Sequence, residues 1–181
     1  AGIKIQNEKY PDGFDYGILH NCMEYGENLA SVLNNATMHE YLNELMSPTC
    51  IMYAYQSSSL GPSGGRNYGS RIHVDSPRFI EGYMTNLGVI FPLCDFTEEN
   101  GATHYLKGSH LSDKVPERDF FFENSSRGVC KKGDMILFNA RVFHAAGTNN
   151  TEETRHSITI NVCRSFMRQR FDFPRLISKD L

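Results

Sequence analysis

His73-Val74-Asp75 opens the stretch of this 181-residue chain that decides its fold, and Arg155-His156-Ser157 closes it. Between them lie the apolar segment Asp134-Met135-Ile136-Leu137-Phe138, which follows a glycine turn, and then His144. Short apolar runs bounded by turn residues indicate strands. The segment Ser157-Ile158-Thr159-Ile160-Asn161-Val162 alternates polar and β-branched residues, which is typical of a half-buried strand. The stretch therefore predicts a β-rich core.

The first histidine and the aspartate are one residue apart, a spacing that suits a shared metal ion. Alternate residues of a strand point to the same face, so His73 and Asp75 can reach one ion together. A third ligand must come from another strand, and His144 is the candidate. Two imidazoles and one carboxylate form a facial triad that holds ferrous iron and leaves three positions open. An H-x-D triplet alone is common by chance, and His144 alone suits a core or surface histidine, so the combination carries the prediction.

The arginine that follows predicts an anionic co-substrate. Iron held by one carboxylate keeps a positive charge, which favours a chelating anion such as the oxalyl end of 2-oxoglutarate. The far carboxylate of that molecule suits a planar, bidentate guanidinium. Arg155 lies eleven residues after His144, enough for a turn and a return strand, and it shares a strand face with Ser157. Taken alone, Arg155 is better explained as a solvated charge, so its position relative to the other residues carries the prediction.

These residues, in this order, resemble the phytanoyl-CoA dioxygenase family of Fe(II)/2-oxoglutarate oxygenases, which includes ectoine hydroxylase. The resemblance covers about residues 50–165, and the pieces that match are His73-x-Asp75, Asp95-x-x-x-Glu99-Asn100-Gly101-Ala102-Thr103, Gly108-Ser109-His110, Lys132-Gly133-Asp134, His144 and Arg155-x-Ser157. In the family, the block that begins at Asp95 forms a turn between two strands of a jelly roll.

The resemblance implies roles for single residues. His73, Asp75 and His144 would bind iron, and Arg155, helped by Ser157, would anchor the 2-oxoglutarate tail. Gln56 falls where ectoine hydroxylase carries a glutamine beside the co-substrate. Related halogenases replace the carboxylate ligand by a small residue, so the presence of Asp75 favours hydroxylation.

Two further features bear on the pocket. Asn86, at one end of a predicted strand over 84–93, can face the cavity and contact a ligand, or it can make a hydrogen bond at the strand end. The segment 57–70, rich in glycine and serine, is predicted as a mobile loop that lines the mouth of the site. We expect substrate specificity to lie in two loops, over residues 57–72 and 111–130.

Composition sets the class and the compartment. At 181 residues with 40% hydrophobic content, we expect a single domain over 1–181, with a helical part over about 1–48 and the jelly-roll core over about 50–165. Apolar spacing predicts helices over 27–46, with a break possible at Asn34-Asn35. A net charge of −3 gives no reason to expect nucleic acid or an anionic membrane as partner. The five scattered cysteines and the absence of a long apolar run or leader pattern favour a cytoplasmic protein with reduced thiols.

The predicted fold is thus mainly β, a double-stranded β-helix (cupin-type jelly roll) with flanking N-terminal helices. The predicted function is that of a non-haem Fe(II)- and 2-oxoglutarate-dependent dioxygenase that uses O2 to hydroxylate a small-molecule or metabolite-linked substrate, releasing succinate and CO2. Two alternatives stay open: a metal-dependent cupin enzyme that needs no 2-oxoglutarate, and a non-catalytic jelly-roll binding module. The sequence leaves the substrate and the oligomeric state open.

Overall fold

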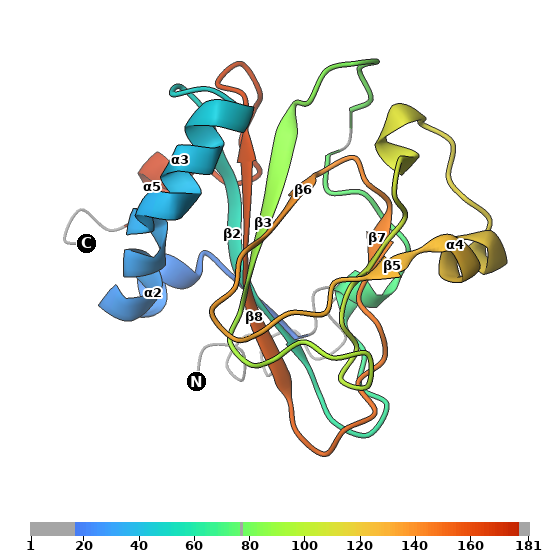
Figure 1. Cartoon of the computed structure of the whole chain (residues 1–181). Coiled ribbons are helices and arrows are strands. Elements are labelled where there is room, and N and C mark those ends of the chain that lie inside the picture. Colours follow the sequence, from blue (N-terminus) through green and yellow to red (C-terminus); the bar gives the residue numbers. More distant parts are fainter. Residues whose placement is uncertain (1–16, 77, 178–181) are drawn as a thin grey trace.

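Two antiparallel sheets form the framework in the computed structural model, which describes residues 17–76 and 78–177 (Figure 1). The larger sheet has the strand order β1 (Ile18–His20), β2 (Ile51–Leu60), β8 (Arg155–Cys163), β3 (Asn86–Pro92) and β6 (Ile136–Asn139). The smaller sheet has the order β5 (Ser126–Arg127), β4 (His104–Tyr105) and β7 (His144–Ala145). Strands far apart in sequence pair side by side, as in a double-stranded β-helix, and the predicted mainly β jelly roll is confirmed.

Strand β8 divides the interior into an apolar side and a polar side. Ile158, Ile160 and Val162 are almost fully buried and belong to the main hydrophobic core, together with residues of β3 and of the helices. The alternating residues on its other face are polar, namely Arg155, Ser157, Thr159 and Asn161. Because successive side chains of a strand point to opposite faces, the apolar face binds the helical layer while the polar face is left to line a cavity.

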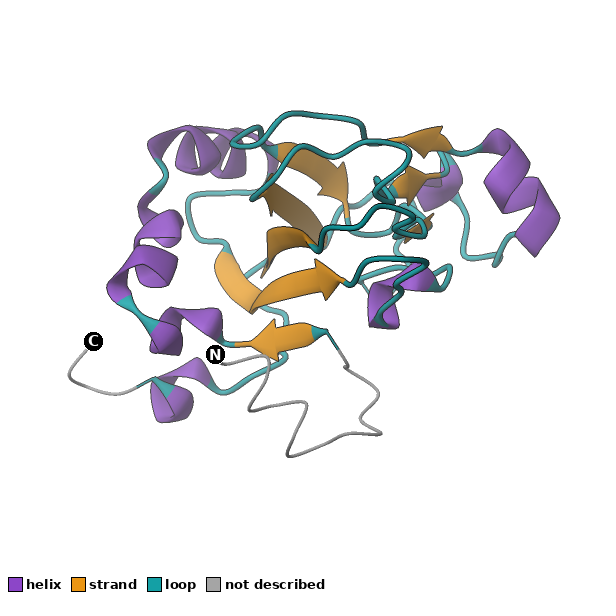
Figure 2. Cartoon of the chain, turned by 90° about the horizontal axis from the view of Figure 1, so that it is seen from below, coloured by secondary structure: helices purple, strands orange, loops and turns teal. Residues whose placement is uncertain are grey.

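The helical layer covers one face of the larger sheet (Figures 1 and 2). It contains the 3-10 turn η1 (Cys22–Tyr25), α2 (Glu27–Ser31), the 3-10 turn η2 (Val32–Asn34), α3 (Ala36–Leu45) and, near the C-terminus, α5 (Phe173–Leu176). The predicted break is confirmed at Asn35, whose side chain caps α3 by accepting a hydrogen bond of 2.8 Å from the N–H of Met38. Met38 and Leu42 then point into the core.

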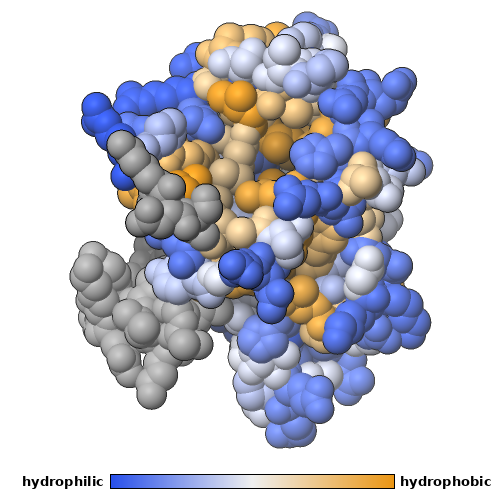
Figure 3. Space-filling view, turned by 90° about the vertical axis from the view of Figure 1, so that its left-hand side faces the viewer, coloured by the Kyte–Doolittle hydropathy of each residue, from blue (hydrophilic) through white to orange (hydrophobic). Residues whose placement is uncertain are grey.

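The outer surface of this layer is mixed in character. Figure 3 looks at the helical side and shows apolar residues between charged ones. Leu29, Val32 and Leu33 lie in this layer only partly buried, and Leu45 is 42% exposed. In the part of the chain that the structure describes, no helix has the length and apolar character needed to cross a membrane.

Three elements differ from the prediction. Part of the predicted N-terminal helical region, at 18–20, is strand β1, and its residues 1–16 lie outside the described residues. Strand β2 continues to Leu60 through serines predicted as loop, because their backbone groups pair with β1 on one side and β8 on the other. Residues 118–124 form helix α4 (Arg118–Asn124), which was not predicted; it is held by Phe121, which is fully buried against Phe143 and Leu106.

Candidate metal centre and its pocket

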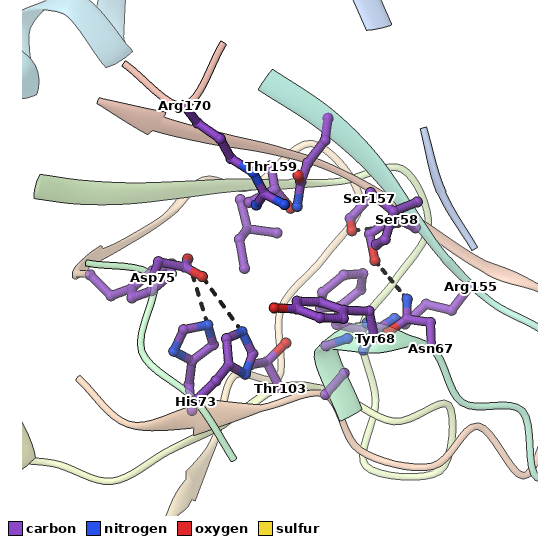
Figure 4. A pocket seen from close by; sticks show the side chains of 18 residues that line it. Ser58, Asn67, Tyr68, His73, Asp75, Thr103, Arg155, Ser157, Thr159 and Arg170 are labelled. Carbon is purple, nitrogen blue, oxygen red and sulfur yellow. Dashed lines mark hydrogen bonds and ion pairs between the residues drawn. The ribbon is translucent and has the colours of Figure 1, made fainter. Parts of the chain in front are cut away.

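Three side chains converge where the two sheets face each other (Figure 4). His73 and His144 pair through two backbone hydrogen bonds, His73 N to His144 O at 3.0 Å and His144 N to His73 O at 2.9 Å. Residues directly opposite in an antiparallel pair project to the same side, and their ring centroids lie 4.2 Å apart. Asp75, two residues after His73, presents Oδ1 at 3.5 Å from Nε2 of His73 and Oδ2 at 3.7 Å from Nε2 of His144.

The hydrogen bond made by Nδ1 of each imidazole determines the protonation of its Nε2. Nδ1 of His73 lies 2.8 Å from the carbonyl oxygen of Arg71, and Nδ1 of His144 lies 2.9 Å from that of Val142. A carbonyl only accepts, so each Nδ1 carries a proton and donates it. In the neutral ring, Nε2 then directs a lone pair toward Asp75, as in metal sites where a second contact sets the tautomer.

Burial and mutual charge set the protonation of the three groups. Burial, reinforced by the neighbouring His73, lowers the pKa of His144 to about 4. Burial also acts to raise the pKa of Asp75, but the two imidazoles, with a smaller contribution from Arg170, outweigh it and hold that pKa below its usual range. Burial acts to lower the pKa of His73, but the hydrogen bond and charge of Asp75 outweigh it and raise that pKa.

The donor set fits a divalent metal ion. One donor atom from each of His73, Asp75 and His144 lies within 4.8 Å of the others, so one ion can contact all three. With both rings neutral, two lone pairs and a carboxylate point at one another, a repulsion that a cation between them would relieve. Two nitrogen donors and one oxygen donor on one side suit non-haem ferrous iron, with positions left for other ligands. The described residues contain no other such cluster of three.

Arg155 occupies the other end of the same pocket. It is 4% exposed, its Nη1 donates to the carbonyl oxygen of Gly101, and its guanidinium lies 4.2 Å from the ring centroid of Phe96. Its Nε is buried with no hydrogen-bond partner among the described residues. Burial lowers the pKa of Arg155 to about 10, so the guanidinium is charged at neutral pH. A buried cation with a spare donor facing a pocket is suited to an anionic ligand.

Gly101 belongs to a turn that holds this arginine in place. Asn100 ties the turn together, because its side chain accepts from Thr97 N at 2.9 Å and donates to Asp95 O at 2.7 Å. Gly101 has φ +82°, and a Cβ there would lie 2.8 Å from the carbonyl oxygen of Gly147, so only glycine fits without strain. The carbonyl that receives Arg155 is therefore fixed by the block from Asp95 that the sequence singled out.

Cross-strand pairs continue the pocket from Arg155 along β8. Ser157 lies opposite Ser58, and Thr159 lies opposite Gln56. All four line the pocket, where Ser157 and Gln56 were expected to meet the co-substrate. The hydroxyl of Ser157 makes only a 3.5 Å contact, with the Ser58 carbonyl, and Oε1 of Gln56 is buried with no partner in the described part of the chain. Both side chains have hydrogen-bonding capacity left for a ligand.

Asn86 does not line the pocket. Of the two roles considered, ligand contact and a strand-end hydrogen bond, the structure shows the hydrogen bond. Asn86 is fully buried, its Nδ2 donates to Asn161 Oδ1 at 2.9 Å, and its Oδ1 accepts from Ser76 Oγ at 3.2 Å. With both ends of its amide occupied, Asn86 ties the start of β3 to β8 and to the residue after Asp75. Its contribution to the site is to hold the strand that follows the aspartate.

A loop predicted to line the mouth does so. Asn67, Tyr68 and Gly69 line the pocket, and Asn67 fastens the loop to β2 by donating to Ser58 Oγ at 2.9 Å. The Tyr68 ring then lies beside His73, with 6.2 Å between their centroids. The segment 111–130, also expected to carry specificity, contributes no residue to this pocket.

The sequence reasoning assigned no role to Thr103, Thr159 and Arg170, which also line the pocket. Thr159 could have been found, since it alternates with Arg155 and Ser157 on one strand. Arg170 carried no such signal, because it lies in the irregular tail after β8. His104 is not part of the triad, and its ring nitrogens contact Arg127 Nη1 at 2.7 Å and Ser125 Oγ at 2.8 Å.

The link between His144 and Arg155 crosses from the smaller sheet to the larger one. Asn149, in the middle of this link, is fully buried. Its Nδ2 donates to the carbonyl oxygens of Leu60 at 3.1 Å, Gly61 at 2.9 Å and Glu153 at 2.7 Å. One side chain therefore fixes the path of the chain between His144 and Arg155.

Comparison with known proteins gives a consistent result. A family model described as phytanoyl-CoA dioxygenase (PhyH) matches residues 10–157. A protein of Mycobacterium tuberculosis, Rv1501, is 25% identical over 178 residues, which is 96% of this chain and 65% of that protein. Dioxygenase trt7 of Aspergillus terreus is 35% identical over 80 residues, or 42% of this chain and 27% of its own length. The chain thus spans less than two thirds of the length of these relatives.

A solved structure supports the fold. The crystal structure of EctD from S. alaskensis, with 2-oxoglutarate and 5-hydroxyectoine, superposes with a TM-score of 0.72 and 18% sequence identity. The match covers 88% of this chain and 60% of that chain. At this identity the likeness establishes the shared jelly-roll architecture.

Proposed function

The chain belongs to the phytanoyl-CoA dioxygenase (PhyH) family, and from this premise we propose that it is a non-haem Fe(II)- and 2-oxoglutarate-dependent dioxygenase. It would hydroxylate a small-molecule or metabolite-linked substrate, with release of succinate and CO2. One observation carries the proposal: the donor atoms of His73, Asp75 and His144 converge within 4.8 Å, in a pocket whose other end holds the buried Arg155.

Each residue of the pocket has a defined task in this proposal. His73, Asp75 and His144 hold the iron, and the carbonyls behind both rings keep their Nε2 atoms free for it. Arg155 receives the distal carboxylate of 2-oxoglutarate, with the hydroxyl of Ser157 beside it. Gln56, one cross-strand pair further along, lies within the pocket to donate to the co-substrate from its amide.

The bound iron, 2-oxoglutarate and dioxygen together supply the oxidising power that inserts oxygen into a C–H bond of the substrate. The protein contributes orientation and exclusion of water. Phe96, Ile90 and Phe138 form an apolar part of the pocket wall between the triad and Arg155. The carboxylate of Asp75 fills the position that related halogenases leave open, which favours hydroxylation.

The partner and compartment follow as part of the same proposal. A pocket of this kind suits a small molecule or a small group on a carrier. All five cysteines are free thiols, which suits a reducing compartment such as the cytoplasm. We further propose that the sheets and the helical layer act as one oxygenase domain, since the helices share their core with β3 and β8.

The test is anaerobic titration of the protein with Fe(II) and then 2-oxoglutarate, followed by visible absorbance and by equilibrium binding of both ligands. We expect a weak metal-to-ligand charge-transfer band that is absent in His144→Ala. The matched control is His39→Ala, because His39 is exposed on α3, where Nε2 contacts the carbonyl of Leu33 at 2.7 Å.

The outcomes separate the alternatives. Iron binding without 2-oxoglutarate binding would point to a metal-dependent cupin enzyme that needs no 2-oxoglutarate. Failure to bind iron would remove the triad assignment and leave a jelly-roll binding module.

A further inference from the structure

A second cation, Arg170, reaches the pocket from the tail that follows β8 (Figure 4). The tail is fastened to the start of β2 by two hydrogen bonds, Arg170 N to Tyr53 O at 3.1 Å and Gln169 Nε2 to Met52 O at 2.6 Å. These bonds hold the backbone of Arg170 at the edge of the larger sheet, and its side chain extends over the polar face of that sheet.

Arg170 also lines an adjoining cavity, here called the Arg170 hollow, with Tyr53, Ala54, Gln56, Asp75, Thr159 and Asn161. The hollow shares Gln56, Asp75 and Thr159 with the main pocket, so the two cavities adjoin at the aspartate of the triad. Of these two cavities, Arg155 and Ser157 line only the main pocket. Arg170 and Asp75 line both cavities, so the guanidinium lies on the same side of the sheet as the candidate metal centre.

The guanidinium of Arg170 has no hydrogen bond or ion pair with any of the described residues, and its nearest aromatic contact is Phe171, 5.6 Å from the ring centroid. Arg175, in the same tail, instead pairs with Asp172 at 3.4 Å. Arg168 is exposed, like Arg170, but lines neither cavity. An exposed arginine is usually a solvated charge, and what distinguishes Arg170 is its position in both cavities.

The register of β8 separates the two cations. Residues rise about 3.4 Å each along an antiparallel strand, so Arg155 and Thr159 are about 14 Å apart along β8. Arg155 lies at one end of the polar face and the Arg170 hollow lies around Thr159 and Asn161 toward the other. A 2-oxoglutarate tail anchored at Arg155 therefore leaves Arg170 available.

Counting charges shows what the hollow would accept. The charged side chains of the two cavities are Asp75, Arg155 and Arg170, with His73 and His144 neutral as metal ligands. A ferrous ion adds two positive charges and 2-oxoglutarate adds two negative ones. Iron, 2-oxoglutarate, Asp75 and Arg155 then sum to zero, and Arg170 is left as one uncompensated positive charge beside the reaction centre.

We propose that Arg170 binds an oxyanion group of the substrate, a carboxylate or a phosphate, in the hollow next to Asp75, and so selects anionic substrates. The inference rests on the proposed function, because it takes the Arg155 end as the place of 2-oxoglutarate. A guanidinium suits both groups, since it presents parallel N–H donors to two oxygens. Thr159 and Gln56 place a hydroxyl and an amide beside it in the same hollow.

The experiment uses the full chain loaded anaerobically with Fe(II) and saturating 2-oxoglutarate, so that Arg155 is occupied. Hexanoate, hexyl phosphate and the neutral hexanamide serve as probes, and binding is measured by calorimetry and by the change in the visible band. We expect wild type to bind at least one anion more tightly than hexanamide. Arg170→Gln should weaken that binding about tenfold or more, because it removes a charge-assisted hydrogen bond.

Controls separate this role from a structural one. Arg168→Gln, on a neighbouring exposed arginine, should bind the anion as wild type does, and Arg170→Lys should restore part of the affinity. The melting temperature and the dissociation constant of 2-oxoglutarate should be unchanged in Arg170→Gln.

Three results would overturn the inference. The first is that neither anion binds better than hexanamide. The second is that Arg170→Gln binds the anions normally. The third is that Arg170→Gln weakens 2-oxoglutarate as much as the probes, which would make Arg170 a second anchor for the co-substrate. If wild type shows no 2-oxoglutarate band at all, the proposed function itself has failed, a result that is distinct from these.

Discussion

Replacement of Arg155 tests the pocket most sharply, because one side chain there is expected to carry both a ligand contact and a structural contact. Arg155→Lys keeps the positive charge but loses the planar fork, and Arg155→Met loses the charge as well. Both variants also lose the hydrogen bond to the carbonyl of Gly101 and the contact 4.2 Å above Phe96.

The two variants should differ in magnitude. Lysine forfeits about one charge-assisted hydrogen bond, about 1.5–3 kcal/mol, which weakens 2-oxoglutarate about tenfold to a hundredfold. Methionine leaves the distal carboxylate without a partner in a site where Arg155 is only 4% exposed. Removing one partner of a buried pair costs about 3–5 kcal/mol, so affinity should fall by a factor of about 10²–10⁴.

The assay is anaerobic titration with 2-oxoglutarate in the presence of Fe(II), with thermal unfolding measured in parallel. Arg164→Lys is the matched control, because Arg164, like Arg155, donates to backbone carbonyl oxygen and lies over an aromatic ring. Its partners are the carbonyls of Met84 at 3.2 Å and Met46, and its guanidinium lies 5.1 Å from the ring centroid of Tyr83. The free energy of unfolding should fall by about 1–2 kcal/mol both in Arg164→Lys and in Arg155→Lys, but only Arg155→Lys should weaken 2-oxoglutarate binding. Equal 2-oxoglutarate affinity in wild type and Arg155→Met would refute the assignment of the anchor.

Three further variants probe the fold around the site. Gly101→Ala should lower the free energy of unfolding by about 2–4 kcal/mol, because φ is +82° and the new Cβ would meet backbone at 2.8 Å. Gly108→Ala, at φ +83° but with open space around the new Cβ, should lower it by only about 1 kcal/mol. Equal losses of the two variants in chemical denaturation would contradict this reasoning. Asn35→Ala removes the cap of α3 and should cost about 1 kcal/mol, against little for Asn34→Ala, where no side-chain bond is made within the described residues; circular dichroism melts decide between them. Burial raises the pKa of Cys22 from 9.0 to about 11. The unfolded chain therefore loses this proton at lower pH than the folded protein, and the free energy of unfolding should fall as pH rises from about 9 to 11. Cys22→Ala should flatten that part of the pH–stability curve, and an unchanged slope would argue against a buried, protonated Cys22.

Much of the candidate metal centre could be predicted from sequence, because the spacing of neighbouring residues indicates which side chains lie together. Arg155 and Ser157 share a face of β8 by strand alternation. The same spacing predicted that His73 and Asp75 act together, although the structure has only a single bridge at His73 and no strand there. That His144 meets them is a long-range fact, expressed in its backbone pairing with His73, and only the order of motifs suggested it. Family resemblance supplied what alternation could not.

Other parts of the site depended on tertiary contacts with no local signature. Serines 57–59 have weak strand preference, yet they continue β2 because neighbours on both sides supply hydrogen-bond partners. Asn86 lies at a strand end, where both ligand contact and a strand-end hydrogen bond were plausible. The hydrogen bond is formed because Asn161 lies next to it across the sheet. Arg170 is placed by a single turn of irregular tail that returns to β2, which no periodicity encodes.

The buried Asn149 has a consequence for how the family can vary in length. The span from His144 to Arg155 connects the candidate metal-binding triad to the arginine, and three hydrogen bonds from one amide hold its path. Even a single inserted residue between 147 and 154 should therefore displace one end of the site relative to the other. The mostly exposed segment 113–117, remote from the pocket, should accept insertions freely. Length variation among relatives is thus expected to concentrate before α4 and to avoid the crossing between the sheets.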